Sequence, residues 1–193
     1  MKTKKRKKIK NNMPKRGFSP VLLIVIIIIL VASFIYYKYH KKIYPTLPTI
    51  KKEKIVLNLY FAEPNTERLI LEERKVKVYG DLTSRSKQLI LELIKGPNTN
   101  LTGTIPPGTT LLDLSINPDG IAFVDFSSEL TNRHPGGSSA ELLTIYSIVN
   151  SLTLNFKEIK KVQILEEGKK VDTIAGHILA IMPFEANTEI IGN

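Results

Sequence analysis

The sequence predicts an α+β protein in which one transmembrane helix precedes a compact domain of one mixed or antiparallel sheet and two helices. A 20-residue segment without formal charge covers residues 18–37. After residue 54, stretches rich in β-formers alternate with two helical stripes in the order β-β-α-β-β-α-β-β. We expect a basic cytoplasmic tail over 1–17, the transmembrane helix over 18–37, a stalk over 38–54, the folded domain over 55–182 and a loose tail over 183–193.

The apolar segment predicts a membrane anchor. Val21 to Leu30 are ten consecutive aliphatic residues. At about 1.5 Å per residue, a 20-residue helix crosses the roughly 30 Å hydrocarbon core of a bilayer. A cleaved signal peptide is the alternative, because Val31-Ala32-Ser33 offers small residues to a peptidase. Tyr36, Tyr37 and Tyr39 favour a retained anchor, since amphipathic rings of this kind sit at membrane interfaces.

The distribution of charge predicts the topology. Residues 1–16 hold nine Lys and Arg and no acid, whereas only Lys38, Lys41 and Lys42 closely follow the apolar segment. This asymmetry places the N-terminus in the cytoplasm and the folded domain outside it, on a single pass through the cell membrane. Without these twelve basic residues, 16 of the 28 remain against 18 acids, so the rest of the chain carries about −2. The net charge of +10 therefore reflects topology, and we expect no nucleic-acid partner.

Segments rich in β-branched and aromatic residues, bounded by Pro, Gly and Asn, predict the strands. The expected strands cover 55–61, 69–79, 109–116, 121–126, 161–165 and a short stretch around Val171. A turn at Glu63-Pro64-Asn65 separates the first two strands. Asn117-Pro118-Asp119-Gly120 also suits a tight turn, so the third and fourth strands are expected to form a hairpin.

Two helices are predicted from their caps and their periodicity. The first begins near Thr83 or Ser84, whose hydroxyl can cap it, and stops at Gly96-Pro97. The second begins at Ser138, which has the capping-box spacing to Glu141. Its apolar residues form one stripe suited to lying on a sheet, namely Leu142, Ile145, Tyr146, Val149 and Leu152.

No recognisable metal or nucleophile pattern is present. His40, His134 and His177 lack the spacing of a zinc site, and the chain has no cysteine, so neither a metal nor another cofactor is expected. The serines at 127, 128, 138 and 139 are not preceded by a nucleophile elbow. Capping and turn roles account for them, and for the histidines a solvated position is expected.

Asp113 and Asp125 are the one pair of acids that invites a catalytic interpretation. A type I turn with Gly120 as a bulge would pair them across the hairpin, like the two carboxylates of a glycosidase. Opposed like charges are destabilising, and a one-residue change of register separates them. We therefore predict that the protein is not an enzyme.

The glycines before the second helix mark a candidate binding site. Gly136 and Gly137 could expose backbone amides to an anion such as the carboxylate of a cell-wall peptide. They also free the backbone for entry into the helix, which is the structural alternative. The candidate residues are Arg133, Gly136, Gly137, Ser138 and Glu141.

Several short motifs occur in an order that resembles a known family. They are Leu93-Ile94-Lys95-Gly96-Pro97, Thr104-Ile105-Pro106-Pro107-Gly108-Thr109, Phe123-Val124-Asp125-Phe126-Ser127, Gly136-Gly137-Ser138-Ser139-Ala140-Glu141 and Val162-Gln163-Ile164. Over residues 55–182 this succession is similar to the GerMN domain of sporulation and spore-germination proteins. The resemblance implies a non-enzymatic extracytoplasmic module with a compact fold like that of ring-building motifs. One such domain is expected here, without the lipoprotein cysteine common in that family.

The expected function is a membrane-anchored extracytoplasmic scaffold or interaction module that helps assemble cell-envelope, sporulation or germination complexes. It would dock through a sheet edge or a helix face, with envelope proteins or its own copies as partners. A peptidoglycan-binding module is the alternative and predicts a polar groove near Arg133 to Glu141. An envelope hydrolase is a third hypothesis, for which the sequence offers no acid–base pair or nucleophile with identifiable support.

Overall fold

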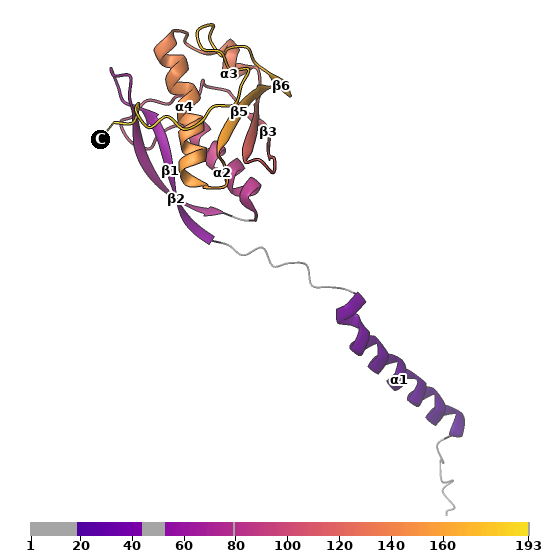
Figure 1. Cartoon of the computed structure of the whole chain (residues 1–193). Helices are drawn as coiled ribbons and strands as arrows, with labels where there is room; N and C mark the ends of the chain where they lie inside the picture. The colour runs from indigo at the N-terminus through magenta and orange to yellow at the C-terminus, as the bar shows by residue number, and fades with distance from the viewer. Residues whose placement is uncertain (1–18, 44–52, 79, 193) are drawn as a thin grey trace, which may run out of the picture. The chain divides into compact units, whose positions relative to one another are not determined.

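The computed structural model describes residues 19–43, 53–78 and 80–192 of the 193-residue chain. Two compact units are present, Met1–Thr49 and Ile50–Asn193 (Figure 1). The basic tail expected over 1–17 lies outside the described residues. Residues 44–52 of the expected stalk also lie outside them.

The first unit contains one helix, α1 (Pro20–Ile43). Within α1, Pro20–Tyr39 form a 20-residue stretch with a mean hydropathy of 2.8 and no buried residue. By length and composition this stretch is able to cross a membrane, and a signal sequence would meet the same criterion. Aliphatic side chains on every face of a helix favour lipid over water as its surroundings.

The second unit contains two sheets, so the prediction of one sheet is wrong. β1 (Glu53–Ala62) and β2 (Leu69–Val78) form a two-stranded antiparallel ribbon. The other sheet has the order β3-β4-β5-β6, with β4 and β5 parallel and the remaining pairs antiparallel. Its strands are β3 (Leu111–Ile116), β4 (Ile121–Phe126), β5 (Lys161–Glu166) and β6 (Lys169–Lys170).

Three helices belong to this unit, α2 (Leu82–Ile94), the one-turn α3 (Glu129–Asn132) and α4 (Ser138–Asn155). The sequence did not predict α3. Asp81 caps α2, because its carboxylate accepts a 2.9 Å hydrogen bond from the Ser84 amide, so the expected cap at Thr83 or Ser84 is wrong. Gly96 follows the helix with φ +83°, the left-handed conformation of a helix stop.

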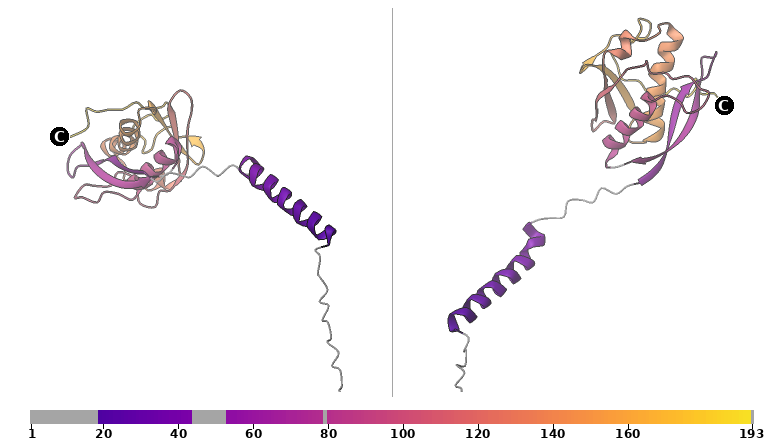
Figure 2. Two further views of the ribbon diagram at one scale, coloured as in Figure 1. Left: turned by 90° about the horizontal axis from the view of Figure 1, so that it is seen from below. Right: turned by 180° about the vertical axis from the view of Figure 1, so that it is seen from behind.

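Helix α4 lies between the ribbon and the four-stranded sheet and contacts both β1 and β5 (Figures 1 and 2). It therefore buries more than the single stripe predicted for it. Its apolar buried residues are Leu143, Ile145, Ile148, Val149 and Leu152, and its polar buried residues include Thr144, Ser147, Asn150 and Ser151. The face of such a helix that meets a strand edge carries polar side chains, because the buried backbone groups of that edge need hydrogen-bond partners. Hydrophobic periodicity does not show which polar residues lie on a buried face of this kind.

The C-terminal segment packs on the domain, which corrects the expected loose tail over 183–193. Phe184 and Val162 exchange two backbone hydrogen bonds of 2.9 and 2.8 Å. Further on, the Leu69 amide donates to the Ile190 carbonyl at 2.8 Å, and the Gly192 amide donates to the Leu69 carbonyl at 2.9 Å. The C-terminal segment is thus hydrogen-bonded both to β5 and to the start of β2.

Candidate functional site

The loop between α3 and α4 and the first turn of α4 carry the five residues that the sequence singled out, but these residues do not converge on one site. Arg133 is exposed, and its Nη1 donates to the Pro107 carbonyl at 3.3 Å. Gly137 precedes α4 with φ +86° and makes no side-chain cap. Ser138 is exposed at the first position of α4, whereas the Glu141 side chain is fully buried. The predicted capping box between these two residues is therefore wrong.

His134 organises this loop. The Gly136 amide donates to His134 Nδ1 at 3.1 Å, so the proton of the neutral ring is on Nε2, which lies 3.0 Å from Thr144 Oγ1. Burial lowers the pKa of His134, and the charge of Glu141 opposes that shift only in part. The ring is therefore half-buried and structural, not solvated as expected. One of the glycine amides offered for anion binding is thereby already in use.

Glu141 holds the C-terminal segment. Its two carboxylate oxygens accept hydrogen bonds from the amides of Ile174, Ala175 and His177 at 2.8–2.9 Å, and from Ile178 at 3.3 Å. Burial alone would raise the pKa of Glu141, but these four amide donors outweigh it and hold that pKa below its ordinary value. Glu141 is thus a buried anion bound by backbone.

A pocket of about 410 Å³ adjoins the same loop. The turn after β1, the segment 102–107 and the start of α4 form its walls. Proline and apolar side chains dominate the lining, with Arg133, Glu63 and several threonines at its polar positions. Of the predicted site residues only Arg133 lines it. A pocket of this composition suits a small, partly apolar group with an anionic end.

Asp113 and Asp125 are register partners across the β3–β4 hairpin, as a bulged turn would have them. Their carboxylates bind different groups. Lys87 Nζ donates to Asp113 at 2.8 Å, while the Gly168 amide donates to Asp125 at 2.8 Å. These partners offset the repulsion between the two acids. Among the described residues, no cluster of three or more His, Cys, Asp or Glu has a metal-binding arrangement.

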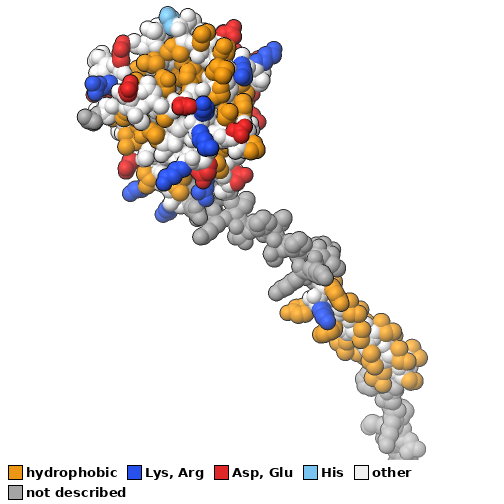
Figure 3. Space-filling view, in the orientation of Figure 1, with side chains coloured by type: hydrophobic (Ala, Val, Ile, Leu, Met, Phe, Trp, Pro, Cys, Tyr) orange, Lys and Arg blue, Asp and Glu red, His pale blue; other side chains and the backbone are white. Residues whose placement is uncertain are grey.

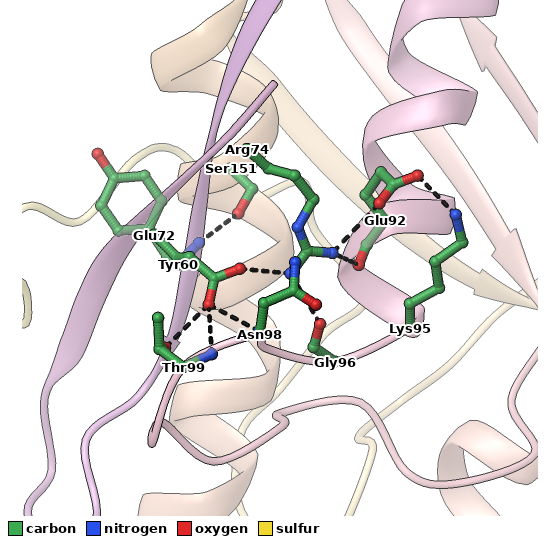
Figure 4. Close-up of polar contacts among 9 residues, drawn as sticks. All are labelled: Tyr60, Glu72, Arg74, Glu92, Lys95, Gly96, Asn98, Thr99 and Ser151. Carbon is green, nitrogen blue, oxygen red and sulfur yellow. Dashed lines mark hydrogen bonds and ion pairs between the residues drawn. The ribbon is translucent and has the colours of Figure 1, made fainter. Parts of the chain in front are cut away.

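A buried ion cluster ties the inner face of β2 to α2 (Figure 4). Arg74 donates from Nη1 to a Glu92 carboxylate oxygen at 3.2 Å and from Nη2 to the Gly96 carbonyl at 2.9 Å, and it pairs with Glu72. The same guanidinium lies 5.8 Å from the centre of the Phe61 ring.

Further donors complete the cluster at both acids. Glu72 accepts from the Asn98 amide at 2.9 Å and from Thr99, and Glu92 accepts from Lys95 at 2.6 Å. Burial alone would raise the pKa of Glu72 and of Glu92, but Arg74 and these other donors hold both pKa values below the ordinary range. The cluster stays charged and holds β2 in place.

The outer edge of β1 is closed by α4. The Asn155 side chain makes the two hydrogen bonds that a neighbouring strand would make. Its Oδ1 accepts from the Asn58 amide at 2.9 Å, and its Nδ2 donates to the Asn58 carbonyl at 2.7 Å. Ser151 Oγ accepts from the Tyr60 amide at 3.1 Å (Figure 4). These contacts occupy outward backbone groups of β1 that a further strand would otherwise bond.

The outer edge of β2 is open. Only Leu69, at its start, bonds to the C-terminal segment. From Leu71 to Lys77, no hydrogen bond to a residue outside the ribbon satisfies the outward backbone groups within the described part of the chain. The edge strand β3 differs, because a register shift between Leu111 and Asp113 interrupts it. Bulges of this kind protect an edge, so β2 is the longest regular free edge among the described strands.

The surface in Figure 3 mixes acidic, basic and apolar side chains and carries no broad field of one sign. The loop after β6 exposes Leu179 and Met182, which are 70% and 67% accessible.

These features define the class of protein as a compact α+β domain, with an open strand edge, that follows an apolar helix. The Germane family, described as "Sporulation and spore germination", matches residues 58–172. The chain belongs to this family. A comparison with curated proteins found no match.

Solved structures share the fold. The first GerMN domain of the sporulation protein GerM from Bacillus subtilis is 22% identical with a TM-score of 0.54, over 70% of this chain and 98% of that one. The tandem GerMN domains of the same protein are 23% identical with a TM-score of 0.54, over 68% of this chain and 46% of that one. A candidate lipoprotein from Clostridium perfringens is 24% identical with a TM-score of 0.51, over 72% of this chain and 93% of that one. The GerMN resemblance seen in the sequence is confirmed.

Two features of the site lay beyond sequence reasoning. Glu141 was named for its spacing to Ser138, and its true partners are 33 to 37 residues away in the chain. The ion cluster was missed altogether, although Glu72 and Arg74 alternate with exposed residues in a strand, which could have indicated charges on a buried face.

Proposed function

We propose that the protein is a membrane-anchored extracytoplasmic interaction module that helps assemble envelope or sporulation complexes. The open edge of β2 is the observation that carries this proposal, because a regular strand with unpaired backbone groups binds another strand by β-augmentation. Membership of a sporulation and germination family supports the setting. The apolar stretch of α1 supports the anchor, and the nine Lys and Arg before it support a cytoplasmic N-terminus.

Site-specific photo-crosslinking tests the interaction role. A photoreactive residue replaces Lys77 at the β2 edge of the full-length chain in its own membrane, during growth and during starvation. The matched control carries the same residue at Lys157, which is exposed beyond α4. We expect envelope or sporulation proteins, or further copies of the chain, to be captured at position 77 and not at 157. Equal capture at both positions, or none, would contradict the proposal.

The topology has a separate test, which the absence of native cysteine simplifies. T66C is in an exposed turn of the domain, and T3C is in the basic tail. A membrane-impermeant maleimide should label T66C in intact cells, and should label T3C only after permeabilisation. Loss of the T3C residue from the mature chain would instead demonstrate a cleaved signal peptide.

Peptidoglycan binding is the second candidate function, and the pocket beside Arg133 favours it. Of the residues predicted from the sequence, Arg133 is the one that lines this pocket, and its guanidinium would bind the carboxylate of a wall peptide. In a pull-down on isolated sacculi, R133A should lower retention of the full-length chain, while the exposed control K157A should not. Equal retention of both variants would exclude this site.

A further inference from the structure

We propose that the free edge of β2 pairs antiparallel with the same edge of a second copy of this chain, with Glu73 opposite Lys75 of that copy. The proposal builds on the function proposed above and specifies its partner. It follows from the backbone pattern of the ribbon, the charges on β2 and the anchoring of the chain.

The backbone pattern decides which residues are available. Asn58 and Tyr60 of β1 bond outward to α4, so Leu59 between them bonds inward to its partner Glu72 on β2. On β2, Leu69 bonds outward to the C-terminal segment. Alternation along a strand then turns the backbone groups of Leu71, Glu73, Lys75 and Lys77 outward, over roughly 20 Å of open edge.

The charges select one register. With a twofold axis at Arg74, Glu73 faces Lys75 of the second copy twice, and Leu71 faces Lys77 twice. All of these are outward-bonding residues, so four pairs exchange about eight backbone hydrogen bonds. Pairing about Glu73 instead sets Glu73 against Glu73. Pairing about Lys75 keeps two Glu73–Lys77 pairs, but it sets Lys75 against Lys75 and leaves three pairs within the open edge in place of four. Opposite charges directly across a sheet stabilise it, and like charges destabilise it.

The inner face accepts this arrangement. Arg74 would lie across from Arg74 of the second copy, yet each guanidinium is already bound by Glu72 and Glu92 of its own chain. The exposed face is free to pair, because Glu73 and Lys75 make no ion pair or hydrogen bond with any side chain in the described parts of the chain.

Lysine on an edge strand normally discourages pairing, because a random incoming strand leaves that charge unmatched. Here the second copy supplies Glu73 opposite Lys75, so the lysine that disfavours pairing with other strands forms an ion pair with this one.

Two-strand pairing buries little surface, which makes it weak in dilute solution. Anchoring in one membrane raises the effective concentration of the copies and favours the pair.

Disulfide trapping between two differently tagged full-length chains tests the register. One chain carries E73C and the other K75C, and both are produced in the same membrane. We expect a mixed disulfide between the two chains, formed at least about tenfold more than between a control pair carrying D119C and K157C, two exposed positions away from the edge. A yield equal to the control would overturn the proposal.

Charge exchange tests the partner. E73K and K75E each place like charges opposite one another at both central pairs. Each single variant should therefore give roughly 10- to 30-fold less crosslinked dimer in the membrane than the wild-type chain. The double variant E73K/K75E, and a mixture of the two single variants, should restore it, since each recreates two opposite-charge pairs. Unchanged dimer yield in the single variants, or no restoration, would contradict pairing between copies.

The outcome is separable from that of the proposed function. If position 77 captures other envelope proteins while E73C and K75C trap no mixed disulfide, the interaction role stands and self-pairing is refuted. If the mixed disulfide forms and the charge exchange behaves as expected, the second copy is the partner of this edge.

Discussion

Replacing Glu141 by glutamine should destabilise the domain strongly. The carboxylate accepts four backbone amides from residues 174–178 and is fully buried. Glutamine keeps one oxygen, which serves two of these donors, and turns an NH₂ group toward the other two. Loss of two charge-assisted hydrogen bonds at about 1.5–3 kcal/mol each gives a loss of about 3–6 kcal/mol. That is a large part of the stability of an ordinary domain.

Urea unfolding of the full-length chain in detergent measures the effect, and hydrogen exchange locates it. We expect E141Q to shift the midpoint to lower urea and to expose the amides of residues 174–178 to exchange. The control E158Q changes an exposed glutamate and should stay within about 0.5 kcal/mol of wild type. A loss below about 1 kcal/mol for E141Q would contradict the role assigned to this carboxylate, because the four amides would then not depend on its charge.

The pH dependence gives an independent check with a defined sign. The pKa of Glu141 is lowered in the folded domain, so the ionised form binds more tightly to the fold than to the unfolded chain. The stabilisation from its charge is complete above the ordinary glutamate pKa of about 4.3. It is lost as pH falls from there through the lower folded pKa. The difference between wild type and E141Q should therefore shrink below about pH 4.3 and stay constant above about pH 6.

Three further changes test the remaining contacts. R74M leaves the buried carboxylate of Glu72 without its cation and should lower the unfolding free energy by about 3–5 kcal/mol in urea titration. N155A leaves the Asn58 amide and carbonyl unpaired and should cost about 1–3 kcal/mol by the same measurement. Truncation after Met182 removes the backbone bonds to β5 and β2, and should lower the midpoint of thermal unfolding and speed limited proteolysis.

Each of these expectations has an opposing result. If R74M is as stable as wild type, the cluster is no more than a solvated group of charges. If N155A unfolds at the wild-type urea concentration, the edge of β1 is not closed by that side chain. If the truncated chain resists protease as well as the full-length one, residues 184–192 contribute nothing to the fold.

Local patterns predicted those elements that depend on near neighbours in the chain. The helix around Val21 to Leu30 and the hairpin around Asn117 to Gly120 were predicted correctly, because periodicity and turn residues act within a few positions. The start of α4 at Ser138 was also correct, although the capping box from which it was predicted does not form. The order of short motifs also sufficed to identify the family.

Local patterns failed where a polar side chain finds its partner far along the chain. Asn155 bonds to Asn58 across 97 residues, and this contact occupies the outer edge of β1 at that position. Glu141 looked like a capping residue because its spacing to Ser138 permits that role, but the protein uses it to hold residues 174–178. A buried acid gains more from four amides than from one cap.

The amino-acid pattern sufficed for the apolar helix, the charge asymmetry around it, the two longer helices of the domain and its family. The division of the strands into two sheets, the closure of the β1 edge by α4 and the open edge of β2 depend on long-range contacts that the pattern does not contain. Hydrophobic period and turn chemistry are properties of neighbouring residues, whereas the pairing of an edge depends on which distant polar groups reach it first.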